Sequence, residues 1–131
     1  RMTVQGDSIQ ELANQTLNAF SARNGLALLY AEVEDGVISA DLFFQLNGKS
    51  AVQFRFAPSE LRELVYSVWE SGFANAMPRS WATMRLVVAD GRVSVDLQYP
   101  DQIDPDEDVS DRRPQIVSNL FSGAAIDYSR A

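Results

Sequence analysis

Three turn dipeptides, each flanked by alternating apolar and polar residues, constrain the fold of this chain most. Asp35-Gly36, Asn47-Gly48 and Asp90-Gly91 favour tight hairpin turns, because these residue types adopt positive backbone φ angles at low cost. The alternation on both sides of each dipeptide is typical of strands that bury one face. The pattern therefore predicts three consecutive antiparallel strands followed by a separate hairpin of two. We expect them at residues 26–35, 37–46, 50–56, 81–89 and 92–99.

Three segments outside these strands show the spacing of amphipathic helices. Apolar residues recur every three or four positions over 7–21, and again after Pro58-Ser59 as far as Gly72. A short C-terminal helix is expected at about 114–122. We therefore predict an α+β fold in which the helices pack on one face of a five-stranded antiparallel sheet. The length of 131 residues predicts one domain, 1–131.

The alternation also assigns side chains to the two faces of the sheet. Apolar side chains are expected on the face that the helices cover, at Leu29, Ala31, Val33, Ile38, Ala40, Leu42, Phe44, Leu46, Val52, Phe54, Phe56, Met84, Leu86, Val88, Val93, Val95, Leu97 and Tyr99. The opposite face is expected to be polar, with Glu32, Asp41, Gln53, Arg55 and Asp96 among its residues. Trp81 and Tyr99 are expected to fill the core rather than to bind a partner.

Composition excludes several classes of function. The chain has no Cys and no His, so it lacks thiol nucleophiles, common zinc ligands and the usual general base near neutral pH. A formal charge of -7 has the wrong sign for binding nucleic-acid phosphates or anionic lipid. No run approaches the about 18 apolar residues of a membrane span, and no signal peptide is recognisable. We expect a cytoplasmic protein with no cofactor, metal or direct nucleic-acid contact.

Two groups of carboxylates could in principle form a metal site or a catalytic pair. Asp104, Asp106 and Asp108 alternate as calcium ligands do, but Pro105 interrupts them and the glycine and glutamate of a calcium loop are missing. Glu32, Asp41 and Asp96 could pair as acid and base, although an exposed polar sheet face explains them without chemistry. We therefore expect no metal site and no enzyme.

The strongest candidate site is an acidic loop at residues 101–111. Residues 101–131 hold seven acidic and three basic side chains. Six of the acids lie in the loop, at Asp101, Asp104, Asp106, Glu107, Asp108 and Asp111. Two interpretations remain open: a solvated loop whose charges keep the protein soluble, or a cluster that imitates phosphates and docks on a basic protein surface.

The helix that starts at Pro58-Ser59 offers a second candidate surface. Its apolar arc is broad, and Tyr66, Trp69 and Phe73 are the aromatic residues expected to anchor a contact there. A helix with so wide an apolar surface is either buried on two sides or packed against another chain. Both a monomer and a homodimer formed through this helix therefore remain open.

The segment from Trp81 to Tyr99, WATMRLVVADGRVSVDLQY, resembles the signature hairpin of the YezG-like antitoxin or immunity family. The shared features are a W-x-x-M start, an Asp-Gly turn and a final Tyr followed by acidic residues. Residues 30–33 before an Asp-Gly turn and Asp111-Arg112-Arg113 before the last helix are similar to that family too. This resemblance implies a cytoplasmic protein that binds and neutralises a cognate toxin, commonly a nuclease domain of a polymorphic toxin.

A second resemblance leaves an alternative open. The order of elements, the small size and the acidic composition are also similar to type III secretion chaperones, which are acidic homodimers that hold an effector segment in apolar grooves. The immunity interpretation predicts binding to a folded toxin domain. The chaperone interpretation predicts an obligate dimer that binds an extended peptide.

Overall fold

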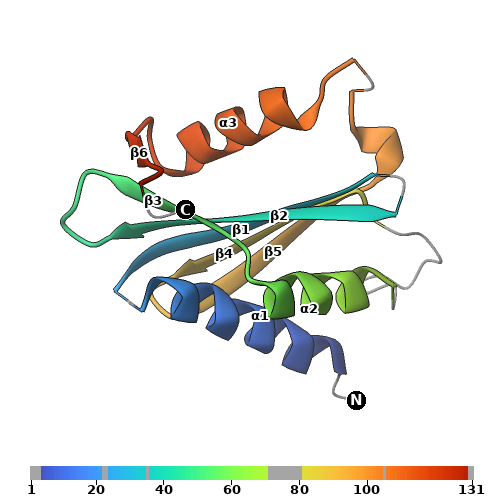
Figure 1. Ribbon diagram of the computed structural model, residues 1–131, viewed down its shortest axis with the longest axis horizontal. Coiled ribbons are helices and arrows are strands. Elements are labelled where there is room, and N and C mark those ends of the chain that lie inside the picture. The colour runs from blue at the N-terminus through green and yellow to red at the C-terminus, as the bar shows by residue number, and fades with distance from the viewer. Residues whose placement is uncertain (1–3, 22–23, 35, 71–80, 105, 130–131) are drawn as a thin grey trace.

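The fold is an α+β arrangement of three α-helices and six strands (Figure 1). The structure is a computed structural model that describes residues 4–21, 24–34, 36–70, 81–104 and 106–129. In chain order the elements are α1 (Val4–Phe20), β1 (Gly25–Glu34), β2 (Val37–Leu46), β3 (Val52–Phe56), α2 (Ser59–Glu70), β4 (Thr83–Ala89), β5 (Arg92–Gln98), the 3-10 helix η1 (Pro100–Gln102), α3 (Val109–Leu120) and β6 (Ile126–Asp127).

The strands form one sheet in the order β5-β4-β1-β2-β3-β6. The five predicted strands are confirmed, and they pair antiparallel throughout. The prediction that they form the whole sheet is wrong, because β6 adds to β3 in parallel. The chain turns back after α3 at Gly123, whose φ of 74° is easy only for glycine. The N–H of Val52 then donates to the carbonyl of Ala125 at 2.8 Å.

The turn between β4 and β5 has the predicted conformation. Asp90 and Gly91 have φ angles of 51° and 78°, and two consecutive positive angles define a mirror-image type I turn. Seven successive residue pairs follow without a break, from Ala89 opposite Arg92 to Thr83 opposite Gln98.

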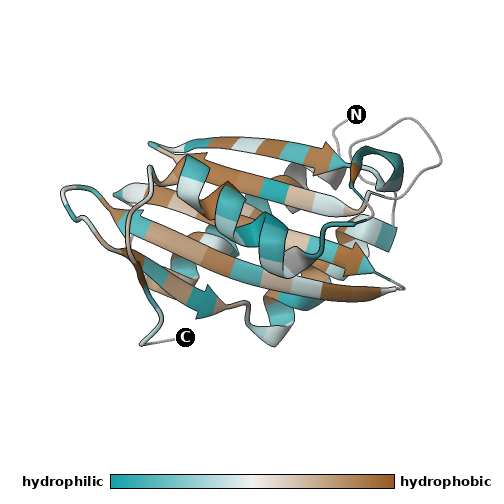
Figure 2. Ribbon diagram, turned by 90° about the horizontal axis from the view of Figure 1, so that it is seen from above, coloured by the Kyte–Doolittle hydropathy of each residue, from teal (hydrophilic) through white to brown (hydrophobic). Residues whose placement is uncertain are grey.

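The prediction that all helices share one face of the sheet is wrong. Helices α1 and α2 cover one face, and α3 lies across the other (Figure 1). The reason is that both faces carry buried apolar side chains, in one cluster beneath α1 and α2 and in a second beneath α3. In Figure 2 the strands accordingly show many brown bands between teal ones. Beneath α3, its residues Val117 and Phe121 bury the second apolar cluster, which comprises Leu28, Tyr30, Phe43, Val52 and Phe54.

The face assignment of β3 is also wrong. Phe54 lies opposite Phe43, so Val52 and Phe54 face α3 rather than α1 and α2. Since a shift of one residue exchanges the two faces of a strand, Arg55 points to the other side, where its guanidinium lies 5.3 Å from the centre of the Phe20 ring. Phe56, expected to be buried, is 65% exposed.

The last helix starts earlier than predicted. We expected it to begin at Pro114, but α3 begins at Val109 and contains Pro114 in its interior. Asp108 caps the helix by accepting a hydrogen bond from the N–H of Ser110 at 2.9 Å. The last four residues of the predicted acidic loop, 108–111, are therefore the cap and first turn of a helix.

Trp81 belongs to the core, as predicted, and is 1% exposed. Tyr99 is half-buried and packs against the apolar cluster that contains Trp81, so its prediction is confirmed in part. Among the described residues, no helix is long and apolar enough to cross a membrane.

Candidate functional site

Two consecutive arginines near the start of α3 attach this helix to the sheet. Arg112 binds Glu32 of β1 in a bidentate manner, with Nη2 donating to Oε1 at 2.7 Å and Nε donating to Oε2 at 3.1 Å. Arg113 forms an ion pair with Asp41 of β2. Glu32 and Asp41 are only 8% and 7% exposed, so these charges are largely removed from water. Bidentate, charge-assisted pairs of this kind fix geometry as well as adding energy.

The sheet register explains why adjacent arginines reach adjacent strands. Tyr30 lies opposite Asp41, and Glu32 follows Tyr30 on the same face of β1. The two carboxylates are therefore diagonal neighbours beneath the first turns of α3. We name this arrangement the arginine clamp and define it as Arg112 with Glu32 and Arg113 with Asp41.

A buried tyrosine extends the clamp. The hydroxyl of Tyr30 donates to Oε2 of Glu32 at 2.5 Å, and Tyr30 is 1% exposed. Burial raises the pKa of the Tyr30 phenol well above its usual range, and the hydrogen bond to Glu32 raises it further. The hydrogen bond to Glu32 likewise raises the pKa of the Arg112 guanidinium. The phenol thus stays neutral and the guanidinium stays charged at ordinary pH.

The clamp also holds the acidic segment, which we define as residues 101–111 with the exception of Pro105. Nη1 of Arg112 donates to the backbone carbonyl of Glu107 at 2.5 Å. One guanidinium therefore contacts both the sheet and the chain that carries the carboxylates. The acidic segment is fixed against the core at its centre.

Some of the acidic side chains have local structural roles. Asp104 accepts a hydrogen bond from the N–H of Asp106 at 2.9 Å, which closes a turn. Asp108 accepts from both the N–H and the hydroxyl of Ser110. The hydroxyl hydrogen bond is the main reason why the pKa of Asp108 is lowered, and backbone N–H groups of the helix start add to this effect.

Five of the six acidic residues predicted for the loop are exposed. Asp101, Asp104, Asp106, Asp108 and Asp111 are exposed, whereas Glu107 is half-buried. In the part of the chain that the structure describes, Asp106 and Asp111 take part in neither of the ion pairs that hold α3, Arg112–Glu32 and Arg113–Asp41. The two arginines that follow in sequence are each paired with a buried carboxylate, Glu32 or Asp41. The acidic segment therefore presents exposed carboxylates at its surface.

The described residues contain no cluster of His, Cys, Asp or Glu arranged to hold a metal ion. Glu32 and Asp41, expected as exposed carboxylates, are instead buried and engaged by arginine. Asp96 is exposed on β5, as expected for the polar face. Two of the three carboxylates proposed as an acid and base pair, Glu32 and Asp41, are thus brought together, but each is paired with an arginine, and Asp96 lies on a different strand.

The second candidate surface, on α2, is mostly polar. Leu61, Val65 and Val68 are buried against the sheet, while Tyr66 is 40% exposed. Trp69 is half-buried beneath Tyr66, and its Nε1 donates to the carbonyl of Trp81 at 2.9 Å, so it serves the fold. Phe73 lies outside the described residues.

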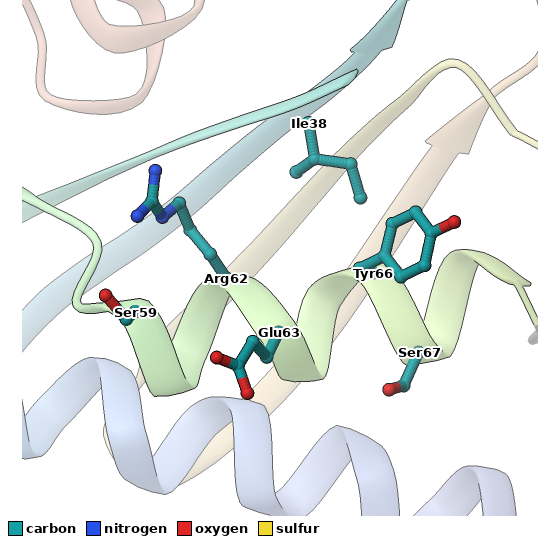
Figure 3. A pocket seen from close by; sticks show the side chains of 6 residues that line it. All are labelled: Ile38, Ser59, Arg62, Glu63, Tyr66 and Ser67. Carbon is teal, nitrogen blue, oxygen red and sulfur yellow. The ribbon is translucent and has the colours of Figure 1, made fainter. Parts of the chain in front are cut away.

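A shallow, open hollow of about 520 Å³ runs along this side of α2. Its lining comprises Ile38, Ser59, Arg62, Glu63, Tyr66 and Ser67. In Figure 3, Arg62 and Tyr66 project from α2 on the side of Ile38, while Glu63 and Ser67 lie on its other side. Tyr66 is thus an exposed aromatic, packed against Trp69, within a mainly polar surface.

The sequence pattern did not identify the arginine clamp, although two signals for it were present. One is the Arg112-Arg113 pair directly after an acidic run, and the other is two carboxylates on neighbouring strands of one sheet face. What was missing was the knowledge that a helix covers that face. No protein-family model and no curated protein matches this chain.

Proposed function

We propose that this protein is an immunity protein that binds and neutralises a cognate bacterial toxin domain. The observation that carries the proposal is the acidic segment: a run of exposed carboxylates fixed to the core by Arg112, with the adjacent arginines matched by buried acids. A surface prepared in this way loses little conformational freedom when it binds, which favours affinity. Its charge selects a partner with a basic surface and accelerates the encounter.

The chemistry of the partner follows from this charge. A toxin domain that acts on nucleic acid must present Lys and Arg to phosphates. A fixed array of carboxylates can cover that surface by steric and electrostatic occlusion, without any turnover. The likeness of the hairpin from Trp81 to Tyr99 to the YezG-like family supports the same conclusion. The protein would act in the cytoplasm, where it protects the producing cell.

The type III secretion chaperone is a second candidate. The order from α1 to α3, helix, three strands, helix, two strands, helix, is similar to that of these chaperones, although β6 follows α3 here, and the exposure of Tyr66 on α2 gives a contact point. The apolar residues of α2, however, are directed into the protein's own core, and the hollow beside them is lined mainly by polar side chains. We therefore favour the immunity function.

The test is capture of the partner from the native organism, followed by a toxicity assay. The retained partner is expressed alone and together with the parent protein. Toxicity that is relieved by co-expression supports the proposal. A partner that is harmless alone, or one retained through an extended segment without any relief of toxicity, would overturn it.

A matched pair of variants locates the binding surface. Asp106→Asn with Asp111→Asn removes two charges from the acidic segment, while Glu63→Gln with Glu70→Gln removes two exposed charges from α2. The net charge of the two double variants is equal. We expect relief of toxicity to weaken only in the first, because the contact depends on where the charge lies rather than on its total.

A further inference from the structure

The two edges of the sheet differ in how far their outer backbone is paired. At one edge, β3 is covered by the two-residue strand β6, so its outer backbone is partly paired. At the other edge lies β5, a seven-residue strand that pairs only with β4. Within the described residues no strand pairs with its free side, and α3 crosses the sheet away from it (Figure 2).

The β5 edge lacks most of the devices that usually prevent strands from joining. Such devices are short length, charged side chains (lysine above all), proline, a bulge, or cover by another element. Strand β5 contains neither proline nor lysine, and its seven pairs with β4 run without a bulge. Its apolar residues Val93, Val95 and Leu97 are only half-buried, whereas Met84 and Leu86 of β4 are fully buried. This edge has the properties of an interface that is incomplete in one chain.

We propose that β5 pairs antiparallel with β5 of a second copy of this chain, which joins the two sheets into one. The pairing places Val95 on the two-fold axis, opposite Val95 of the partner subunit. Val93 then lies opposite Leu97 of the partner subunit, so the half-buried apolar residues of both copies form one continuous row. The two acidic segments come to lie at opposite ends of the joined sheet.

The charges on the other face of β5 fit this register. Ser94 lies opposite Asp96 of the partner subunit, and Arg92 lies diagonal to the same carboxylate, within reach of a long side chain. If the two-fold axis passed through Asp96 instead of Val95, Asp96 would lie opposite Asp96 of the partner subunit, where like charges repel. The strand is therefore self-complementary, which favours a second copy over an unrelated extended peptide.

The dimer goes beyond the proposed function and does not depend on it. It also differs from a dimer formed through α2, because α2 packs on one face of the sheet, whereas β5 lies at its edge. Analytical ultracentrifugation of the full chain at several concentrations tests it. We expect a reversible dimer. A protein that stays monomeric at every concentration would overturn the proposal.

Ser94 supplies a matched pair of variants at one exposed position. Ser94→Asp places a carboxylate opposite Asp96 of the partner subunit in both halves of the interface, so we expect about tenfold weaker dimerisation. Ser94→Lys places an ammonium there and should leave the dimer at least as stable. Equal dimerisation by both variants would contradict the register, and loss of the dimer only in Tyr66→Arg would assign it to α2.

A charge exchange gives an independent test that does not rely on Ser94. Arg92 and Asp96 are four residues apart on one strand, about 13 Å, so they cannot contact each other within a chain. Arg92→Glu should weaken the dimer, and Asp96→Arg added to it should restore dimerisation, with Asp96→Arg alone as the control for repulsion from Arg85, which lies opposite Asp96 on β4. Circular dichroism verifies that each variant is folded. Absence of restoration in a folded double variant would overturn the proposal.

Discussion

Arg112 of α3 and Glu32 of β1 are 80 residues apart in sequence and form a bidentate ion pair that is almost shielded from water. The same guanidinium holds the carbonyl of Glu107. A single side chain therefore connects the central sheet, the last helix and the acidic segment. This connection makes the position of the surface carboxylates a property of the fold.

Breaking the clamp on one side should strongly destabilise the protein. Glu32→Ala leaves the half-buried Arg112 without its counter-ion, and removal of one partner of a buried pair costs about 3 kcal/mol or more in the free energy of unfolding. Glu34→Gln, at an exposed position on the same strand, should change that free energy by less than about 0.5 kcal/mol. Denaturant titration measures both. Equal stability of the two variants would show that the ion pair contributes nothing.

The buried phenol gives the protein a pH dependence at alkaline pH. The pKa of Tyr30 is higher in the folded protein than in the unfolded chain. Its contribution to the free energy of unfolding is therefore fully present below a pH of about 10 and declines as the pH rises above that value. Tyr30→Phe should reduce this decline, while Tyr66→Phe should not. The test is to measure the free energy of unfolding of the parent and both variants below and above a pH of about 10. If this free energy declines equally with pH in all three proteins, the prediction is contradicted.

The capping carboxylate acts at the opposite end of the pH scale. The pKa of Asp108 is lowered by its hydrogen bonds from Ser110. Its contribution to the free energy of unfolding is therefore present above the ordinary pKa of about 3.9, and it is lost as the pH falls through the lowered pKa. An NMR titration should find Asp108 deprotonated at a pH where an ordinary Asp is half protonated. In a Ser110→Ala variant its pKa should move back toward the ordinary value. An unshifted pKa in the parent would refute the cap.

Trp81 tests the distinction between a core residue and a binding anchor. Because its side chain is 1% exposed, Trp81→Ala should lower the free energy of unfolding by about 3 to 5 kcal/mol. Among the described residues its Nε1 has no hydrogen-bond partner, so Trp81→Phe should cost much less, since it removes an unsatisfied polar group along with volume. Thermal unfolding measures both. An unchanged melting temperature in Trp81→Ala with lost partner binding would make Trp81 an anchor.

Local patterns in the sequence predicted the local structure well. Dipeptides such as Asp90-Gly91 marked the hairpins because the turn requires positive φ at both positions. Period-two alternation assigned Leu29, Leu42 and Leu86 to the face that α1 and α2 cover. Burial of Trp81 also followed from its place at the start of a strand in a small domain.

The errors arose where one face depends on an element distant in sequence. The polar residues Glu32 and Asp41 suggested an exposed face, but they are partners of α3 and lie beside the apolar Tyr30 and Phe43. Once that face is covered, Phe54 can be buried there, and the register of β3 follows. Strand β6 was missed because a two-residue strand carries no detectable period.

The acidic segment was found from charge alone, but its role is a proposal that only a partner can test. The most direct measurement is the rate of association with the captured toxin domain at low and high salt. Asp106→Asn with Asp111→Asn should associate about tenfold more slowly than the parent at low salt and depend less on salt. Glu63→Gln with Glu70→Gln should behave like the parent. Equal rates and equal salt dependence for all three proteins would contradict the claim that the acidic segment binds the toxin.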